Sequence, residues 1–270
     1  DYNTLDLVSI LKPGDLLIAN NTKVIKSRVS GQLGLKNISI TMLNEHKPGI
    51  WQALVKGSKK LNLGDEIKLP NDMVISVNRK GERGLIFFDV NKSKLDFINY
   101  LNMYGELPLP PYIKVGEENE SIIRYQTLFA KNYGAVAAPT AGLHCTKNLK
   151  NKLANNSIDI AEITLHLVSG TFLPIEVSDI SKHSMHSEYF TIDEAVADKI
   201  NSTKKNGGRI ISIGTTVLRS LESTSNESGY IQPFKGETSI FISPGNKIKS
   251  SDYLLTNFHL PKSTLFILVC

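Results

Sequence analysis

The sequence predicts an α/β domain interrupted by a small inserted antiparallel β-barrel domain. Between residues 26 and 88, five or six short strand-like segments are separated by Gly, Pro, Asn and Asp, a pattern typical of antiparallel strands joined by tight turns. After residue 112, strand patterns alternate with helix patterns, which indicates an α/β sheet. An apolar segment at 14–19 precedes the barrel, so the barrel is an insertion. The predicted boundaries are 1–25 plus 112–270 for the α/β domain and 26–111 for the barrel.

The barrel is expected to be closed or nearly closed, because closure removes exposed strand edges. A helix is predicted after it, over residues 92–103. An extended connector follows at Pro108–Pro111, where proline excludes both a helix and an inner strand. The individual barrel strands are predicted at residues 38–42, 51–55, 66–69, 73–77 and 85–88.

The α/β part is expected to contain buried strands rich in branched residues and helices between them. The predicted strands are 14–19, 158–167, 209–214, 239–242 and 265–269, and the predicted helices are 143–154 and 193–205. The last of these strands ends at Cys270. Since a buried strand usually runs on into polar residues, we expect the natural sequence to continue beyond it.

The composition is that of a globular protein, with 270 residues of which 41% are hydrophobic. No apolar run approaches the roughly 20 residues that span a bilayer, and no signal peptide is recognisable, so we expect a cytoplasmic protein without a membrane partner. Cys145 and Cys270 are far apart and lack a CxxC spacing. The two cysteines therefore support neither a disulfide framework nor a cysteine-rich zinc site.

The net charge of +5 permits a polyanionic partner such as RNA, because contacts between lysine and phosphate release counterions. The alternative, that these are solvated surface lysines, stays open at this point. The lysines that gather in the sequence are Lys56, Lys59 and Lys60, then Lys147, Lys150 and Lys152, then Lys204 and Lys205.

Common nucleotide-binding and hydrolase motifs are absent: the chain has no GxGxxG, no GxxxxGK[ST] and no GxSxG. The chemistry is therefore expected from five polar clusters in the second half of the chain. Most of them lie at predicted strand ends or helix starts, where ligands gather in α/β proteins. The clusters contain Pro139, Thr140 and His144; His166, Gly170 and Thr171; His183, His186 and Glu188; Gly214, Thr215, Thr216 and Arg219; and Thr256, Asn257 and His259.

The first two clusters suit ligand binding. Small residues before His144 let a ligand approach the backbone, and Thr140 is placed to cap the helix that follows. Period-two alternation puts His166 on the face opposite Leu165, just before a glycine break. A plain capped turn and a hydrogen-bonded structural histidine remain as the alternatives at these two positions.

The third cluster raises the question of a metal site, since imidazole and carboxylate groups are common zinc ligands. On a helix His183 and His186 share a face and Glu188 does not; on a strand His186 and Glu188 share a face and His183 does not. The spacing thus favours substrate-binding polar groups over a metal.

The fourth and fifth clusters are predicted to bind anionic or hydroxyl-rich groups. Thr215 and Thr216 follow a buried strand and stand at a helix N-terminus, where backbone amides favour such ligands. Helix capping by threonine is the alternative there. In the fifth cluster Pro261 fixes a turn that presents Asn257 and His259.

Taken together, these residues closely resemble one family, the S-adenosylmethionine:tRNA ribosyltransferase-isomerases, which add the cyclopentane precursor of the modified base queuosine. The resemblance spans nearly the whole chain, and the shared order of many short stretches carries it. The matching stretches are Gly105–Tyr112, Arg124–Thr127, Gly134–His144, Thr164–His166, Gly170–Phe172, His183–Tyr189, Gly214–Thr216 with Arg219, and Leu254–Thr264.

The resemblance implies an α/β domain interrupted by a barrel, and a reaction in which the ribosyl part of S-adenosylmethionine is transferred to 7-aminomethyl-7-deazaguanine at the tRNA wobble position and isomerised. The products are epoxyqueuosine-tRNA, adenine and methionine. S-adenosylmethionine is a co-substrate and no further cofactor or metal is implied. The partner is the anticodon arm of tRNA, and we expect a monomer.

The reaction needs a base beside the sulfonium-activated ribose carbon, and a histidine with an unperturbed pKa of about 6.5 suits that role. Our hypothesis is that the catalytic residues that line the pocket are His166, His186, His259 and Glu188. The residues expected to hold the ribose or the methionine carboxylate are Thr215, Thr216 and Arg219.

The chain departs from the family pattern at Cys145, at Val168-Ser169, and at Asn21 and Lys23, where the family has Asp and Arg. The family pattern also continues before Asp1 and after Cys270. Two alternatives follow. One is a catalytically inactive tRNA-binding fragment of the same family, and the other is a zinc-dependent hydrolase that uses His183, His186 and Glu188.

Overall fold

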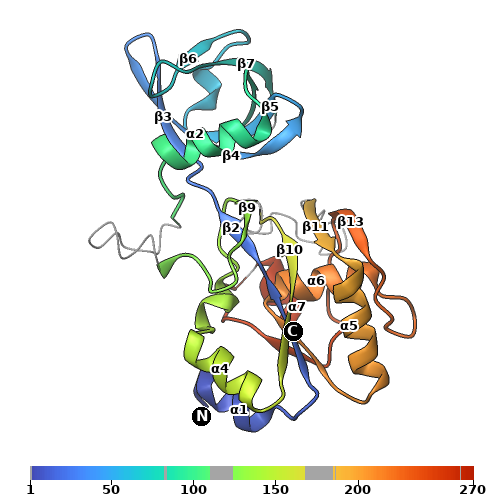
Figure 1. Ribbon diagram of the computed structural model, residues 1–270. Helices are drawn as coiled ribbons and strands as arrows, with labels where there is room; N and C mark the ends of the chain where they lie inside the picture. Colours follow the sequence, from blue (N-terminus) through green and yellow to red (C-terminus); the bar gives the residue numbers. More distant parts are fainter. Residues whose placement is uncertain (1, 82–83, 110–123, 168–184, 186, 262) are drawn as a thin grey trace. The chain divides into compact units, whose positions relative to one another are not determined.

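The computed structural model describes residues 2–81, 84–109, 124–167, 185, 187–261 and 263–270 (Figure 1). The chain forms two compact units: an α/β unit of residues 1–23, 119–132 and 138–270, and a barrel unit of residues 24–118 and 133–137. The predicted fold class, an α/β domain with an inserted antiparallel barrel, is confirmed. Residues 133–137 group with the barrel unit, where Ile25 N donates a hydrogen bond to Ala135 O (3.0 Å).

Six antiparallel strands close the barrel in the order β3-β4-β5-β8-β7-β6. Closure is completed by the pairing of Gln32 with Lys68. The five individually predicted strands are all present, and β3 is the sixth. The strands are β3 (Arg28–Leu33), β4 (Lys36–Lys47), β5 (Ile50–Val55), β6 (Glu66–Lys68), β7 (Val74–Lys80) and β8 (Leu85–Val90).

The barrel interior is an apolar core. Alternate residues of β5 are buried, as expected where one face of a strand points inward. Helix α2 (Lys94–Tyr104) adds Phe97, whose ring meets that of Trp51 edge-on with 4.9 Å between centroids. Leu61, which follows the 3-10 helix η2 (Ser58–Lys60), lies in the same core. Burying a side chain of this size contributes about 1.5–3 kcal/mol, so this core is a main source of the unit's stability.

Local chemistry sets the ends of α2, which was predicted at residues 92–103. Ser93 is the N-cap, and its hydroxyl accepts a hydrogen bond from Asp96 N (3.2 Å). The helix ends at Gly105, where a Cβ atom would lie 2.0 Å from Lys26 O. Only glycine permits this close backbone approach. Of the predicted proline connector, Pro110 and Pro111 lie outside the described residues.

The α/β unit is built on a six-stranded sheet of order β13-β11-β10-β1-β12-β14. The four strands β10, β1, β12 and β14 are parallel, and β11 and β13 extend the sheet in antiparallel pairing. All five residues of the central strand β1 are buried. The strands are β1 (Leu16–Asn20), β10 (Asp159–Leu165), β11 (Glu188–Ile192), β12 (Ile210–Ile213), β13 (Phe234–Thr238) and β14 (Tyr253–Leu255).

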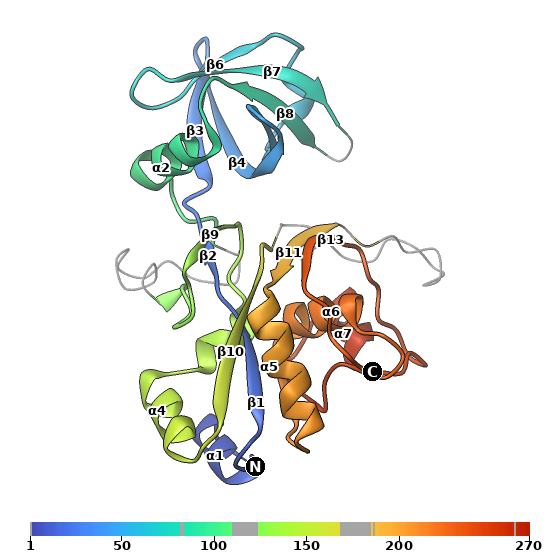
Figure 2. The ribbon, with the colours of Figure 1, turned by 45° about the vertical axis from the view of Figure 1, so that its right-hand side comes forward.

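Helices cover both faces of this sheet (Figure 2). Residues Leu17 and Ala19 of β1 face a cluster that includes α1 (Leu7–Ile10) and α4 (Lys147–Asn155), whereas α5 (Glu194–Lys205) and α6 (Thr215–Thr224) pack on the opposite face. The shorter elements are η1 (Thr4–Asp6), η3 (Thr140–His144) and a two-stranded sheet of β2 (Thr22–Val24) and β9 (Asn132–Ala135).

Two predicted elements differ from the structure. Most of the helix expected over 143–154 is confirmed as α4, which begins only at Lys147 because Thr146 caps it by accepting a hydrogen bond from Leu149 N (3.1 Å), and η3 precedes it as a separate element. The strand expected over 239–242 is wrong. β13 ends at Thr238, whose hydroxyl accepts a hydrogen bond from Ile240 N (3.1 Å).

The strand expected over 265–269 is a helix, α7 (Thr264–Val269). Ser263 caps it by accepting a hydrogen bond from Phe266 N (3.1 Å). Thr264 is its one buried residue, so the run is not a core strand. A short apolar run fits either state, and here the serine cap favours the helix.

Both cysteines are free thiols, in agreement with the absence of a disulfide framework. Cys145 is buried, and burial raises the pKa of its thiol to about 11, so it is protonated and unreactive at neutral pH. Cys270 is exposed. Over the described part of the chain, every helix is too short or too polar to cross a bilayer.

Candidate active site

The segments that follow the four parallel strands meet at one edge of the sheet, because parallel strands end on the same side. β10 leads to His166, β12 to Gly214, and β14 to Thr256. The strand β1 separates β10 from β12. With neighbouring strands about 4.8 Å apart, the ends of β10 and β12 are about 10 Å from each other.

His166 is oriented by Thr22, the first residue of β2. Its ring Nδ1 lies 2.8 Å from Thr22 Oγ1, and its backbone N donates to Tyr189 O (3.1 Å). The buried Asn20 joins β1 to β10 here, because its Oδ1 accepts from Leu165 N (3.1 Å) and its Nδ2 donates to Leu165 O (2.9 Å). Sequence reasoning missed both Asn20 and Thr22. The one signal in the sequence was that Asn20 directly follows the apolar run of residues 16–19.

The structure joins the first and fifth predicted clusters. Asn257 Nδ2 donates to Thr140 Oγ1 (2.9 Å), and Asn257 Oδ1 lies 2.6 Å from His144 Nε2. Since an amide oxygen only accepts, His144 Nε2 is the donor, and a neutral His144 keeps its lone pair on Nδ1. The neighbouring Pro139 is buried, and Thr256 is half-buried.

The N-terminus of α6 abuts this group. Gly214 is its N-cap, with a φ of 95° that favours glycine, and Gly214 N donates to Leu255 O (2.8 Å). A Cβ atom on Gly214 would lie 3.4 Å from Ala141 Cβ and 3.6 Å from Thr216 Oγ1. The amides of the first helical turn have no partners within the helix, so they form a site for an anion or a polar ligand.

Two buried hydroxyl groups beside this turn lack a hydrogen-bond partner among the described residues: Thr216 Oγ1 and Thr127 Oγ1. Thr127 lies over Gly142, where a Cβ atom would meet Thr127 Cγ2 at 3.1 Å. Leaving a buried hydroxyl unsatisfied costs about 1–3 kcal/mol. Groups of this kind are expected to bond a ligand or water, so Thr127 joins the candidate binding residues.

Glu188 and Arg219 form an ion pair inside the α/β unit. Arg219 Nη1 contacts Glu188 Oε2, both side chains are almost completely buried, and Arg219 Nε donates to Ile240 O (3.2 Å). Arg219 Nη2 has no partner in the part of the chain that the structure describes. The pair links β11 to α6. The sequence predicted these groups as a catalytic carboxylate and a ligand-binding cation, and the structure shows them bound to each other.

His259 is half-buried, and its Nδ1 is buried without a hydrogen-bond partner in the described ranges. Burial lowers the pKa of its imidazole, because the charged form loses its hydration. His259 is therefore neutral at pH 7, the state in which an imidazole accepts a proton.

Four predicted site residues lie outside the described residues: Gly170, Thr171, His183 and His186. The roles predicted for them, the zinc alternative included, stay predictions. Among the residues that the structure describes, no group of three His, Cys, Asp or Glu side chains is arranged to hold a metal ion.

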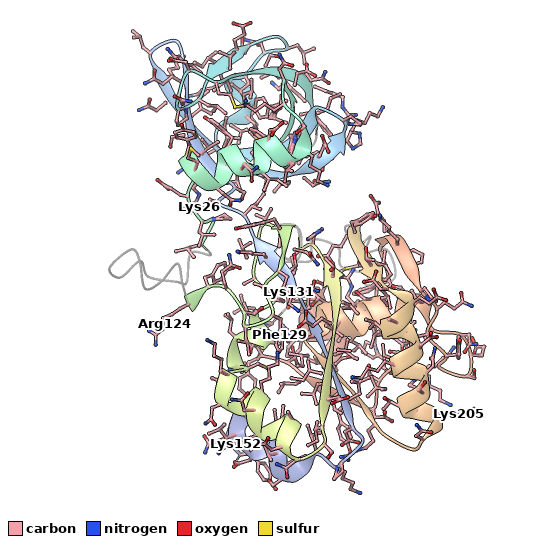
Figure 3. The ribbon with its side chains drawn as sticks, viewed as in Figure 1. Lys26, Arg124, Phe129, Lys131, Lys152 and Lys205 are labelled. Atoms are coloured by element: carbon pink, nitrogen blue, oxygen red, sulfur yellow. The ribbon has the colours of Figure 1, made fainter. Side chains whose placement is uncertain are left out.

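Asn21, one of the departures from the family pattern, is the centre of a polar network. Its Oδ1 accepts from Thr164 Oγ1 (2.7 Å) and from Asn132 Nδ2 (3.1 Å). Its Nδ2 reaches Glu162 Oε2 (3.4 Å), which also pairs with Lys131 Nζ at 2.6 Å (Lys131 is labelled in Figure 3). An asparagine both donates and accepts here, and an aspartate would only accept.

Comparisons with known proteins identify the family. The model of the queuosine biosynthesis protein family matches residues 1–270. The chain is 42% identical over 285 residues to an S-adenosylmethionine:tRNA ribosyltransferase-isomerase of Afipia carboxidovorans, covering 100% of this chain and 78% of the relative. It is 43% identical over 271 residues to the protein of the same name from Francisella philomiragia, covering 100% and 79%.

One solved structure that is similar to this chain is the crystal structure of an S-adenosylmethionine tRNA ribosyltransferase from Thermotoga maritima. The two sequences are 27% identical, the match covers 98% of this chain and 74% of that chain, and the TM-score is 0.46. A family model that matches the full length, together with relatives above 40% identity, defines the class of the protein. The chain belongs to the queuosine biosynthesis protein family.

Proposed function

We propose that this chain transfers the ribosyl part of S-adenosylmethionine to 7-aminomethyl-7-deazaguanine at the tRNA wobble position and isomerises it, giving epoxyqueuosine-tRNA, adenine and methionine. Its match to relatives named S-adenosylmethionine:tRNA ribosyltransferase-isomerase supports this reaction. The structural observation that carries the proposal is the polar edge of the α/β sheet, where the N-terminus of α6 meets the group of Thr140, His144 and Asn257.

The N-terminus of α6 is the proposed site for the methionine carboxylate of S-adenosylmethionine. Backbone amides and the positive end of the helix dipole attract a carboxylate, and the unsatisfied Thr216 hydroxyl adds a donor. Gly214 permits the positive φ with which the chain enters α6, and this places the Thr216 hydroxyl beside the helix N-terminus. Arg219 is bound to Glu188 in this structure, so we assign it the support of α6 and not a direct contact with the carboxylate.

The base that removes the proton from the ribose carbon beside the sulfonium is proposed to be a histidine of this edge. His259 is held neutral by burial, which suits a proton acceptor near pH 7. His166 has a fixed ring orientation because of Thr22. Asn257 and Thr140 are proposed to bind the opened sugar or the departing adenine, since amide and hydroxyl groups bond both.

We further propose that the enzyme needs no cofactor beyond its co-substrate, works as a monomer and acts in the cytoplasm on the anticodon arm of tRNA. The alternative of an inactive fragment is not favoured, because the whole chain matches relatives that are named as the enzyme. Gel filtration with light scattering tests the monomer.

The experiment is to incubate the chain with S-adenosylmethionine and precursor tRNA that carries the deazaguanine, and to measure adenine by chromatography and epoxyqueuosine by mass spectrometry. We expect both products in equal amounts. His166→Ala and His259→Ala should lower the rate, by about a hundredfold or more for the base itself. The control is Leu35→Ala, a fully exposed residue of the barrel to which no role is assigned. No adenine from the unmodified chain would reject the function, and unaltered rates in both variants would reject the base assignment.

A further inference from the structure

Most of the excess positive charge of the chain lies in the barrel unit. Residues 24–118 and 133–137 contain 14 Lys and Arg against ten Asp and Glu, a net charge of +4 out of the +5 of the whole chain. All other residues together carry a net charge of +1. A polyanionic substrate is drawn to the surface that carries the excess.

Four of these cations lie together where β5 runs into η2 and where β7 ends. Lys56, Lys59 and Lys60 follow β5, and Lys80 is the last residue of β7. Lys80 Nζ donates to Leu61 O (2.7 Å) and reaches Lys59 O (3.5 Å), so the end of β7 lies against the η2 segment. We call these four residues the lysine cluster.

A group of Arg79, Phe87 and His46 lies on the outer wall of the barrel, and Arg79 precedes Lys80 of the lysine cluster in β7. Phe87 points outward, because its neighbours Ile86 and Phe88 belong to the core. The Arg79 guanidinium lies 3.9 Å from the Phe87 ring centroid, and the His46 ring meets Phe87 edge-on at 5.1 Å. Arg79 and His46 are exposed. A guanidinium held over an aromatic ring offers a cationic surface on which a nucleotide base can stack.

The described residues do not neutralise these cations locally. Within the described residues, neither the lysine cluster nor Arg79 forms an ion pair, whereas Lys68 pairs with Asp72 at 2.6 Å. Two connections carry these residues, the one from β5 to β6 and the one from β7 to β8. Their described residues include one acid, Asp65, whose carboxylate accepts a hydrogen bond from Asn62 N (2.8 Å). Cations gathered in this way repel one another, and phosphate groups relieve that repulsion.

We propose that the lysine cluster with Arg79, Phe87 and His46 is a binding surface for the phosphate backbone of tRNA, on which the Arg79 plane takes an unpaired base. The identity of the RNA rests on the proposed function, but the charge argument does not. Anionic phospholipid is the competing polyanion, and vesicles of phosphatidylserine and phosphatidylcholine serve as its probe.

The test compares two charge-reversed double variants of the full chain, Lys59→Glu/Lys60→Glu and Lys92→Glu/Lys94→Glu. Both pairs are exposed residues of the barrel unit, and each changes the net charge equally. Binding of precursor tRNA is measured by fluorescence anisotropy over a range of KCl concentrations. We expect the first variant to raise the dissociation constant about tenfold or more and to lower the salt slope by about two, and the second to change it less than about threefold.

Equal weakening by both variants, or no weakening by the first, would overturn the proposal, as would a first variant that loses binding to vesicles but not to tRNA. Circular dichroism melts establish that both variants are folded. Adenine-release kinetics separate this inference from the proposed function: the first variant should raise KM for tRNA and leave kcat and KM for S-adenosylmethionine unchanged. If the unmodified chain released no adenine but the binding contrast held, the function alone would fail.

Discussion

The two units differ in where they keep their polar groups. Among the described residues, 14 polar or charged residues are buried, and Ser27 is the one that belongs to the barrel unit. The α/β unit holds the others, including the Glu188–Arg219 ion pair and the unsatisfied hydroxyls of Thr127 and Thr216. The barrel has an apolar interior and carries its charge on the outside.

This difference indicates a division of tasks. A buried polar group costs stability unless it is fully hydrogen-bonded, so a chain keeps such groups where a ligand uses them or where they hold another element in place. The α/β unit has the interior of a binding and catalytic unit. The barrel has the interior of a stable scaffold, and its contribution to function is expected from its surface.

The largest expected effect that tests this comparison comes from Arg219→Met. The change removes the Arg219 side of a buried ion pair, and breaking such a pair by removing one partner costs about 3–5 kcal/mol. The loss should fall on the α/β unit alone. Trp51 is the single tryptophan of the chain and lies in the barrel core, so its fluorescence reports the barrel during urea unfolding, and circular dichroism reports both units.

We expect the circular dichroism transition of Arg219→Met to move to lower urea while the fluorescence transition keeps its midpoint. The double variant Glu188→Leu/Arg219→Met removes both charges and should recover most of the loss. Fluorescence and circular dichroism midpoints that fall together would show that the two units unfold as one, and the comparison would then lose its energetic basis.

Much of the barrel could be predicted from the sequence, because turn residues separate its strands. β3 was not placed individually, since Arg28–Leu33 is largely polar and contains Gly31. A Cβ atom on Gly31 would lie 2.5 Å from Ile67 Cγ2, so the glycine is required by the neighbouring β6. A contact of this kind between segments far apart in the chain leaves no local pattern.

The site shows the same limit. The sequence located Thr140 and Asn257 in separate clusters, and their hydrogen bond joins positions 117 residues apart. The pairing of Glu188 with Arg219 was not foreseen, because the sequence carries no sign of which polar groups become buried and bind each other. Thr127 was recognised only as part of a family stretch, and its unsatisfied hydroxyl became visible through packing on Gly142.

A smaller effect is expected from Thr127→Val, which removes the hydroxyl and keeps the shape of the side chain. If the Thr127 hydroxyl bonds S-adenosylmethionine, the dissociation constant measured by calorimetry should rise about three- to tenfold, the equivalent of about 1 kcal/mol. The free energy of unfolding should not fall, because the hydroxyl has no protein partner among the described residues. Ser27→Ala is the matched control: its hydroxyl is equally buried and unsatisfied but belongs to the barrel. Equal affinities in the two variants would remove Thr127 from the site.

The smallest effect concerns pH and His259. Its imidazole pKa is lowered in the folded state, because burial disfavours the charged form. Unfolding therefore takes up a proton as the pH falls below the ordinary value of about 6.5, so His259 favours the folded state above that pH and progressively less below it. The urea midpoint of the α/β unit should fall as the pH is lowered from 7 toward the lowered pKa of His259, and His259→Gln should make that dependence shallower. The urea midpoint reported by Trp51 should change with pH equally in both proteins. If the Trp51 midpoint responded to His259→Gln, the two units would be coupled in unfolding, because His259 lies in the α/β unit and Trp51 reports the barrel.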